Sequence, residues 1–297
     1  MKKALLQLHG AVFLWGFTGV LGRAISLDAV LLVWYRLLIT VLSLWILFYF
    51  RKKISRISKA SVLKISLLGF ILSLHWVCFY ASIKYANVTI ALTCLSTAAL
   101  LSSILEPLVL GRRFDSFEIL LGLFAIAGIV VIYNTHLQFS IGIGIGLISA
   151  LLTVLVSVYN KKIIHDYAPE EITLYQLSGG FIGLTLLLPL NNYLVAPQQM
   201  YPTVPDWIWL LILSWICTIL TFYLYIRSLK KVSAFTMNLT LTLEPVYGII
   251  LAFFFYHENK YLSNWFYLGF GLIALAVVLH TWRLMKPMQE LSNNPTH

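Results

Sequence analysis

The chain has 297 residues, of which 60% are hydrophobic and only 11% are charged, and its mean hydropathy is +0.87. A soluble domain of this size cannot hide so much apolar surface, so the composition excludes a soluble protein and indicates one that lies in a membrane. The formal net charge of +10 by itself suggests a nucleic-acid partner, but the positions of the charges argue against that partner.

Ten apolar stretches fill nearly the whole chain. A helix that crosses a bilayer needs about 20 predominantly apolar residues, and each stretch is close to that length. In chain order they are Leu5–Gly22, Ala29–Phe50, Val62–Ile83, Val88–Leu110, Phe117–Thr135, Ser140–Tyr159, Ile172–Leu190, Trp207–Ile226, Ser233–Tyr256 and Trp265–Trp282. We therefore predict an all-α membrane protein with ten transmembrane helices.

The basic residues alternate between the predicted loops and set an orientation. With a cytoplasmic N-terminus, the opposite side of the membrane receives only Arg23, Lys84 and Lys260. The cytoplasmic loops and termini collect Lys2, Lys3, Arg51, Lys52, Lys53, Arg56, Lys59, Lys64, Arg112, Arg113, Lys161, Lys162, Arg227, Lys230, Lys231, Arg283 and Lys286. This is the positive-inside pattern, so the charge is an orientation signal with some attraction to anionic lipid. Both termini are predicted to be cytoplasmic.

The two halves of the chain resemble each other at a fixed spacing. Leu92-Thr93 recurs as Leu239-Thr240, and Gly122 recurs as Gly269, each 147 residues further on. Because each copy holds five spans, an odd number, the second copy enters the membrane from the opposite side. Inverted repeats recur in secondary transporters, with the substrate site near the midplane between the halves. The predicted units are a first repeat at 1–136, a second repeat at 137–285 and a short cytoplasmic tail at 286–297.

Several segments are similar to a known family. They are LWGFTGVLGRAI in the first span, WYRLL in the second, LHWVCFYASIKYANVTIALT across the third and fourth, and LTLEPVYGIILAFFFYHE followed by LGFGLIALAVVL near the end. Together they resemble the EamA-type branch of the drug/metabolite transporter superfamily. The resemblance implies ten helices in two inverted five-helix repeats and export of amino acids or other small metabolites, without fixing the substrate. The chain departs from internal symmetry where Thr97-Ala98 matches Glu244-Pro245.

An ionisable side chain inside a span is unfavourable by several kcal/mol unless it is paired or hydrated, so it normally faces the interior of the bundle. The candidates are Arg36, His75, Glu106 and Glu244. Glu244 lies near the middle of the ninth span and precedes Pro245, which cannot donate to the carbonyl four residues earlier. The freed carbonyl beside a carboxyl group makes a polar niche. Glu244 therefore has two interpretations. In the functional one it binds a cargo amine or carries a coupling proton; in the structural one it is a neutral group at a kink.

The other ionisable candidates each leave two interpretations. Glu106-Pro107 repeats the dipeptide nearer the cytoplasmic end of the fourth span, which favours a structural or gating role over cargo contact. Arg36 is always charged. In one interpretation it is neutralised by a carboxylate, which belongs to the cargo, to Glu106 or to Glu244. In the other, its side chain snorkels or braces backbone carbonyls. His75 either binds cargo or titrates during transport, or is held by a neighbouring hydroxyl group.

Neutral side chains complete the predicted site. Trp15 shares a face of the first span with Thr18, Gly19 and Gly22, which indicates tight helix packing or, alternatively, the aromatic wall of a cavity. The remaining candidates to line a central cavity for the cargo are Tyr80, Thr97, Tyr159, Gln176, Tyr223 and Asn238. Cys78, Cys94 and Cys217 lie inside spans without paired spacing, so neither a disulfide nor a metal site is expected.

These features favour a secondary exporter of small metabolites such as amino acids, working by alternating access in a bacterial cytoplasmic membrane. The chain has no Walker-type glycine loop and no expected cofactor; protons are a candidate coupling ion, and the oligomeric state stays open. A carrier of phosphorylated or nucleotide-linked sugars is the alternative, although such cargo should need two or more buried cations. An intramembrane enzyme is disfavoured, because His257-Glu258 lacks a second His and no Asp lies well inside a span. A lipid scramblase or a purely structural membrane protein is a further alternative.

Overall fold

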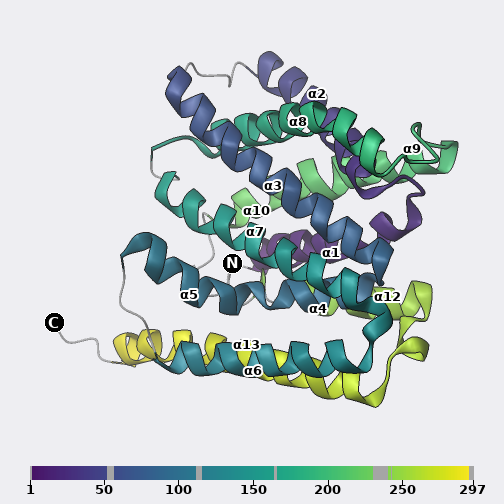
Figure 1. Ribbon diagram of the computed structural model, residues 1–297. Helices are drawn as coiled ribbons and strands as arrows, with labels where there is room; N and C mark the ends of the chain where they lie inside the picture. The colour runs from purple at the N-terminus through teal and green to yellow at the C-terminus, as the bar shows by residue number, and fades with distance from the viewer. Residues whose placement is uncertain are drawn as a thin grey trace.

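The computed structural model describes residues 2–51, 57–111, 116–163, 166–229, 240–241 and 243–293, and within these ranges the chain is all-helical, without a strand (Figure 1). In chain order the elements are α1 (Lys2–Ala24), α2 (Ala29–Phe50), α3 (Lys59–Tyr85), α4 (Val88–Ser96), α5 (Ala98–Leu110), α6 (Ser116–Thr135), η1 (Leu137–Phe139), α7 (Ser140–Ile163), α8 (Pro169–Leu194), α9 (Val204–Leu211), η2 (Ile212–Leu220), α10 (Thr221–Leu229), α12 (Glu244–Tyr256), η3 (Glu258–Tyr261) and α13 (Asn264–Asn293).

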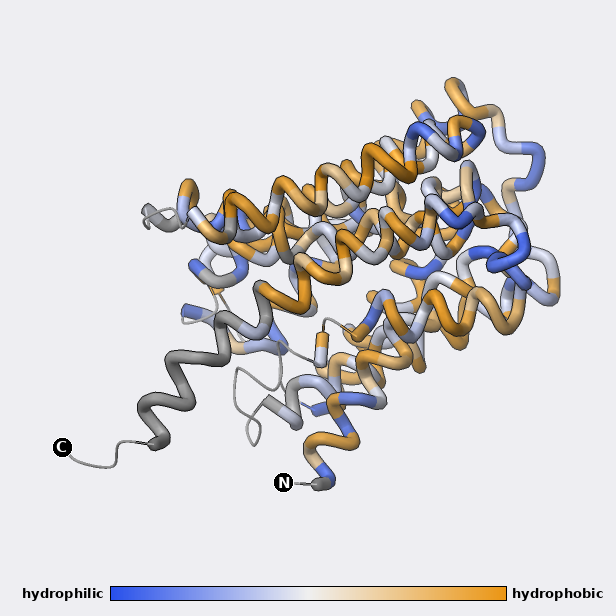
Figure 2. Tube along the Cα trace, turned by 90° about the horizontal axis from the view of Figure 1, so that it is seen from below, coloured by the Kyte–Doolittle hydropathy of each residue, from blue (hydrophilic) through white to orange (hydrophobic). Residues whose placement is uncertain are grey.

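Six described segments are long and apolar enough to cross a membrane on their own, and α4 with α5, bent by 43°, makes a seventh. The six are α1, α2, α3, α7 with η1, α8, and α9 continued through η2 into α10. Helices α6, α12 and α13 contain shorter apolar stretches. Hydrophobic residues run along the helices and hydrophilic residues gather mainly at their ends and connections (Figure 2). The chain is therefore a multi-pass membrane protein, and the count of ten spans stays a prediction.

Side-chain caps explain where several helices begin. The carboxylate of Asp28 accepts hydrogen bonds from the backbone N–H groups of Val30 and Leu31 at the start of α2. Asn87 caps α4 in the same way through its side-chain oxygen. Such caps satisfy backbone donors that have no partner inside the helix. Because only residues 25–28 separate α1 from α2, and 86–87 separate α3 from α4, these helices turn back directly on one another.

The packing of the helices has an approximate two-fold pattern. Helix α3 packs against α7 and α8, while α1 packs against α10 and α2 packs against η2. Helix α2 also contacts α8, and α6 lies beside α13 along one edge of the bundle (Figure 1). If each element of the first half is exchanged with its counterpart in the second, the same pairs of helices are in contact. The two halves thus pack as two copies of one unit.

Glycines at the α6–α13 crossing show the same reciprocity. A Cβ atom added to Gly128 would lie 2.5 Å from the carbonyl oxygen of Gly269, and one added to Gly269 would lie 2.6 Å from the oxygen of Gly128. Both distances are too short for any side chain, so the two backbones approach each other through matched glycines. Small residues at such crossings are what close packing of membrane helices requires.

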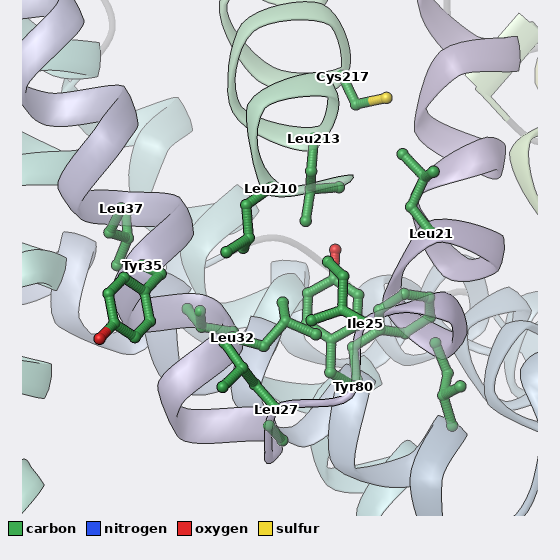
Figure 3. Close-up of a cluster of buried hydrophobic side chains, with 14 of the residues drawn as sticks. Leu21, Ile25, Leu27, Leu32, Tyr35, Leu37, Tyr80, Leu210, Leu213 and Cys217 are labelled. Atoms are coloured by element: carbon green, nitrogen blue, oxygen red, sulfur yellow. The ribbon is translucent and has the colours of Figure 1, made fainter. Parts of the chain in front are cut away.

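A buried apolar cluster joins the two halves next to the candidate site (Figure 3). Its members include Leu21, Ile25, Leu27, Leu32, Leu37, Tyr80, Leu210, Leu213 and Cys217. They come from α1, the connection between α1 and α2, α2 and α3 in the first half, and from α9 and η2 in the second. All three cysteines are free; Cys94 and Cys217 are buried, as their places inside apolar spans suggested, whereas Cys78 is only partly buried.

Candidate functional site

A cavity of about 470 Å³ lies among helices of both halves. Its wall includes residues of α1, α2, α3, α4 and α5 from the first half and of α7, α10, α12 and α13 from the second. The predicted site residues that the structure brings together on this wall are Trp15, Arg36, His75, Tyr80, Glu244 and Pro245. Serine and threonine side chains and aromatic rings make up much of the remainder, so the cavity is mainly apolar with a few polar groups, as small-molecule sites are.

Arg36 lies in α2 and is 4% exposed. Its Nε and Nη2 donate to the hydroxyl oxygen of Thr218 at 3.2 and 2.9 Å, and Nη1 donates to the hydroxyl of Tyr80 at 3.0 Å. The guanidinium carbon stands 3.9 Å from the centre of the Trp76 ring, a distance at which a cation is attracted to an aromatic face. The snorkelling alternative for Arg36 is therefore wrong, because the group is buried inside the bundle.

His75 in α3 is fixed by Ser149 of α7. Its Nδ1 lies 2.9 Å from the carbonyl oxygen of Ser149, and the Ser149 hydroxyl donates to the carbonyl of His75 at 3.0 Å. Because a carbonyl can only accept, Nδ1 carries the proton and Nε2 of the neutral ring is an acceptor. His75 lines the cavity, and no described residue hydrogen-bonds Nε2. The ring is both anchored by a partner in the other half and able to meet a ligand.

Glu244 is the first residue of α12, and Pro245 follows in the first helical turn. A proline in the first turn breaks no intrahelical hydrogen bond of α12 itself, and the kink expected at Pro245 stays a prediction, because residue 242 lies outside the described residues. Helix α12 starts at the cavity. Close packing against α1 holds it there, since a Cβ atom on Gly16 would lie 2.8 Å from the Glu244 carbonyl oxygen.

The corresponding helix of the first half also breaks at the cavity. α4 ends at Ser96 and α5 starts at Ala98, with Thr97 between them. Thr97 is buried and its hydroxyl donates to the carbonyl of Cys94 at 2.6 Å, while its neighbours Ser96 and Ala98 line the cavity. Interrupted helices at the midplane are a common way for transporters to build a substrate site.

Trp15 forms the aromatic wall proposed as its second interpretation. Its ring lies 6.2 Å from that of Phe222 and 5.3 Å from that of Tyr225, centre to centre. Both partners belong to α10, and Trp15 and Phe222 line the cavity. The helix-packing interpretation also applies to this face, because a Cβ on Gly19 would touch Val88 at 3.0 Å.

Other predicted site residues lie elsewhere. Tyr159 is 41% exposed, with the Lys162 amine 5.5 Å from its ring centre. Gln176 donates to the side-chain oxygen of Asn160, and Tyr223 is exposed. Glu106 and Pro107 lie in α5, beyond the cavity residue Ser102. Asn238 lies outside the described residues. These assignments stay predictions.

Sequence patterns did not indicate Thr218, although it supplies two of the three hydrogen bonds to Arg36. A threonine in an apolar span is ordinary, and nothing local marks it. It stands in η2, a stretch of wide π-helical turns, where its own hydroxyl proton goes to the carbonyl of Leu213 at 2.8 Å. Such turns often occur at functional positions. Trp76 and Ser149 were likewise missed, because only the tertiary fold brings them to Arg36 and His75.

The described contacts between the halves that involve a carboxylate, those of Asp206 and Glu258, lie at one end of the bundle. We call it the Asn87 end; it comprises Ser26, Asn87, His136, Thr203 and Glu258 with their neighbours. Asp206 accepts from the backbone N–H and the hydroxyl of Ser26 at 2.8 and 2.6 Å. The apolar cluster of Figure 3 stands between this end and the cavity, since Leu21 follows Thr18 along α1 and Ile25 comes directly after the end of that helix. The cluster therefore separates the cavity from the Asn87 end.

The described residues contain no group of three His, Cys, Asp or Glu side chains that would hold a metal ion. The arrangement instead offers one cation, one imidazole acceptor and one carboxyl group around a hollow between two similar halves. A cavity between two similar halves of a multi-pass helical protein is an arrangement found in many secondary transporters.

Comparison with known proteins agrees with that class. The sequence profile of the EamA-like transporter family matches residues 2–134 and again residues 140–280, and the chain belongs to this family. An uncharacterized transporter of Archaeoglobus fulgidus is 26% identical over 175 residues, which are 59% of this chain and 60% of that protein, so the match spans about three fifths of its length. A solved structure, described only as a crystal structure of a protein, covers 96% of this chain and 99% of its own with a TM-score of 0.59 and 17% identity, which shows a shared fold.

Proposed function

We propose that the chain is a secondary transporter that exports small metabolites, with amino acids as the first candidates, by alternating access across a bacterial cytoplasmic membrane. Ten transmembrane helices in two inverted five-helix repeats, 1–136 and 137–285, would form the path, with both termini in the cytoplasm. Membership of a transporter family favours transport over enzymatic chemistry. The cavity between the halves is the observation that carries the proposal.

The depth of the cavity residues supports this role. Arg36 stands seven residues after the start of α2, and Glu244 stands twelve residues before the end of α12. At 1.5 Å per residue these positions are about 10 and 18 Å from the Asn87 end. The apolar layer of a bilayer is about 30 Å thick. The polar groups of the cavity therefore bracket the midplane, where a site can be opened first to one side and then to the other.

The closed end supports the direction of access in this conformation. The Asn87 end carries the connections that the charge pattern places outside the cell, and it is sealed by the inter-half contacts of Asp206 and Glu258. The cavity would then be reached from the cytoplasm, as an exporter loading its cargo requires. In the proposed cycle those contacts break when the halves rock to the outward-open state. Glu244 is the candidate to bind a cargo amine or to carry a coupling proton.

A counterflow experiment tests the proposal. Purified protein in liposomes preloaded with an unlabelled amino-acid mixture should accumulate the labelled mixture, and the cargo should leave chemically unchanged. Glu244→Gln should slow the exchange at least tenfold while unfolding at the same temperature as the wild type. Asp166→Asn removes one exposed carboxylate outside the cavity and should exchange normally. Wild-type exchange by Glu244→Gln would remove Glu244 from the site, and no exchange of any small solute by the wild type would count against transport.

A further inference from the structure

Arg36 is the part of the cavity that specifies a chemical group for the cargo. The guanidinium is buried about 10 Å from the Asn87 end of α2, and it keeps its charge at physiological pH. A cation at such a depth is unfavourable unless an anion or water faces it. Since the group lines the cavity, whatever occupies the cavity meets that charge.

Every protein group in contact with this guanidinium is neutral. Two hydroxyl oxygens, those of Thr218 and Tyr80, accept its hydrogen bonds, and the Trp76 ring covers one face. Among the residues that the structure describes, no carboxylate oxygen lies within 4.0 Å of it. Glu106 and Glu244, the two internal acids considered from the sequence, therefore do not form an ion pair with Arg36 in this conformation.

The hydrogen bonds leave donors for a ligand. A guanidinium has five N–H groups, and the contacts with Thr218 and Tyr80 use one on each nitrogen. One N–H therefore remains on each of Nη1 and Nη2. A guanidinium can donate to both oxygens of a carboxylate, which is the fork geometry that distinguishes Arg from Lys.

The surrounding groups hold the side chain in place without neutralising it. The hydroxyl proton of Thr218 is committed to the carbonyl of Leu213, so only its lone pairs face the guanidinium. The backbone carbonyl of Arg36 accepts from Ser214 of the other half at 3.1 Å. An unneutralised cation held by neutral partners is pre-organised for an anion that arrives from outside the protein.

We infer that Arg36 binds a single carboxylate group of the cargo, an inference that rests on the transport function proposed above. Arg36 is the one permanent cation on the wall of the cavity as the structure describes it. A phosphate monoester carries about two charges at neutral pH and would need more than one such partner. The cargo class is therefore a small monocarboxylate, with or without an amino group, whose apolar part lies against Trp15, Trp76 and Phe79.

Matched acid and amide ligands test this assignment. Full-length protein in lipid nanodiscs is titrated with hexanoate and hexanamide, L-leucine and L-leucinamide, and glucose 6-phosphate. Binding is followed by the change in tryptophan fluorescence, to which Trp15 and Trp76 on the cavity wall contribute. The wild type should bind each carboxylate about tenfold to a hundredfold more tightly than its amide, as charged hydrogen bonds allow. Arg36→Gln should bind the amides normally and lose the preference. Arg36→Lys should keep only part of it, and Lys64→Gln, which loses an exposed charge of α3, should keep all of it.

Equal binding of acids and amides by the wild type would overturn the assignment, even if Arg36→Gln did not fold. A preference retained in Arg36→Gln, or tighter binding of glucose 6-phosphate than of the carboxylates, would overturn it too. The proposed transport function is judged separately by counterflow. A wild type that exchanges solute without any carboxylate preference would refute the role of Arg36 and leave transport intact.

Discussion

Replacing Glu258 by Gln should destabilise the protein by roughly 3 kcal/mol. Glu258 is 1% exposed and accepts three hydrogen bonds at the start of α4, from the N–H of Val88 at 3.1 Å and from the N–H and hydroxyl of Thr89 at 2.7 and 2.6 Å. A carboxylate is favoured at a helix N-terminus. A hydrogen bond to a charged group contributes about 1.5–3 kcal/mol and a neutral one about 0.5–1.5, so losing the charge weakens each of the three by about 1 kcal/mol.

The ion pair of Glu258 with Arg23 provides the matched comparison. The Arg23 side chain is 38% exposed, and exposed pairs contribute about 0–1 kcal/mol. Arg23→Gln should therefore destabilise by less than about 1 kcal/mol. Unfolding in mixed micelles of rising SDS content measures both variants, with the reactivity of Cys94 and Cys217 as the signal, because these thiols are 1% and 0% exposed in the folded protein. A Glu258→Gln variant as stable as the wild type, or a larger effect of Arg23→Gln, would refute the assignment of α4 capping to Glu258.

Two further predictions concern the packing and the pH dependence of stability. Gly69→Ala would place a Cβ atom against the backbone carbonyl of Gln176 in α8 and should destabilise the protein by about 1–3 kcal/mol through overpacking. Gly10→Ala is the control, because the added atom meets open space there. In the same unfolding assay it should be neutral or slightly stabilising. His136 accepts from the hydroxyl of Ser263 at 2.9 Å through Nε2, and burial lowers its pKa below 6.5. Folding thus favours the neutral form of His136. The contribution of this neutral form to the free energy of unfolding is complete above about pH 6.5 and is lost as the pH falls below that value. The fall in melting temperature between pH 7.5 and 5.5 should be smaller in His136→Asn, and an identical fall in both proteins would contradict this.

The sequence predicted best where local chemistry decides the structure. The span Ala29–Phe50 coincides with α2, because an acidic cap precedes an uninterrupted apolar run. Arg36, His75 and Glu244 were found because an ionisable group in a span stands out against its neighbours, and all three line the cavity.

Features that depend on tertiary contacts escaped prediction. The break at Thr97 has no proline or glycine beside it, and the polar partners Thr218 and Ser149 look like ordinary residues of apolar helices. Tyr35-Arg36-Leu37 resembles Tyr175-Gln176-Leu177, so Gln176 occupies the position of Arg36 in the second half. Gln176 nevertheless bonds Asn160 within its own half. Equivalent positions of two repeats need not carry equivalent chemistry once the halves have diverged.

The relative orientation of the two halves can be measured by cysteine labelling. Ser116 and Asn264 are the exposed first residues of the corresponding helices α6 and α13. In a background with Cys78, Cys94 and Cys217 replaced by Ser, a membrane-impermeant maleimide should label Asn264→Cys in intact cells and Ser116→Cys only after permeabilisation. Labelling of both positions from the same side would contradict two oppositely oriented halves around a central cavity.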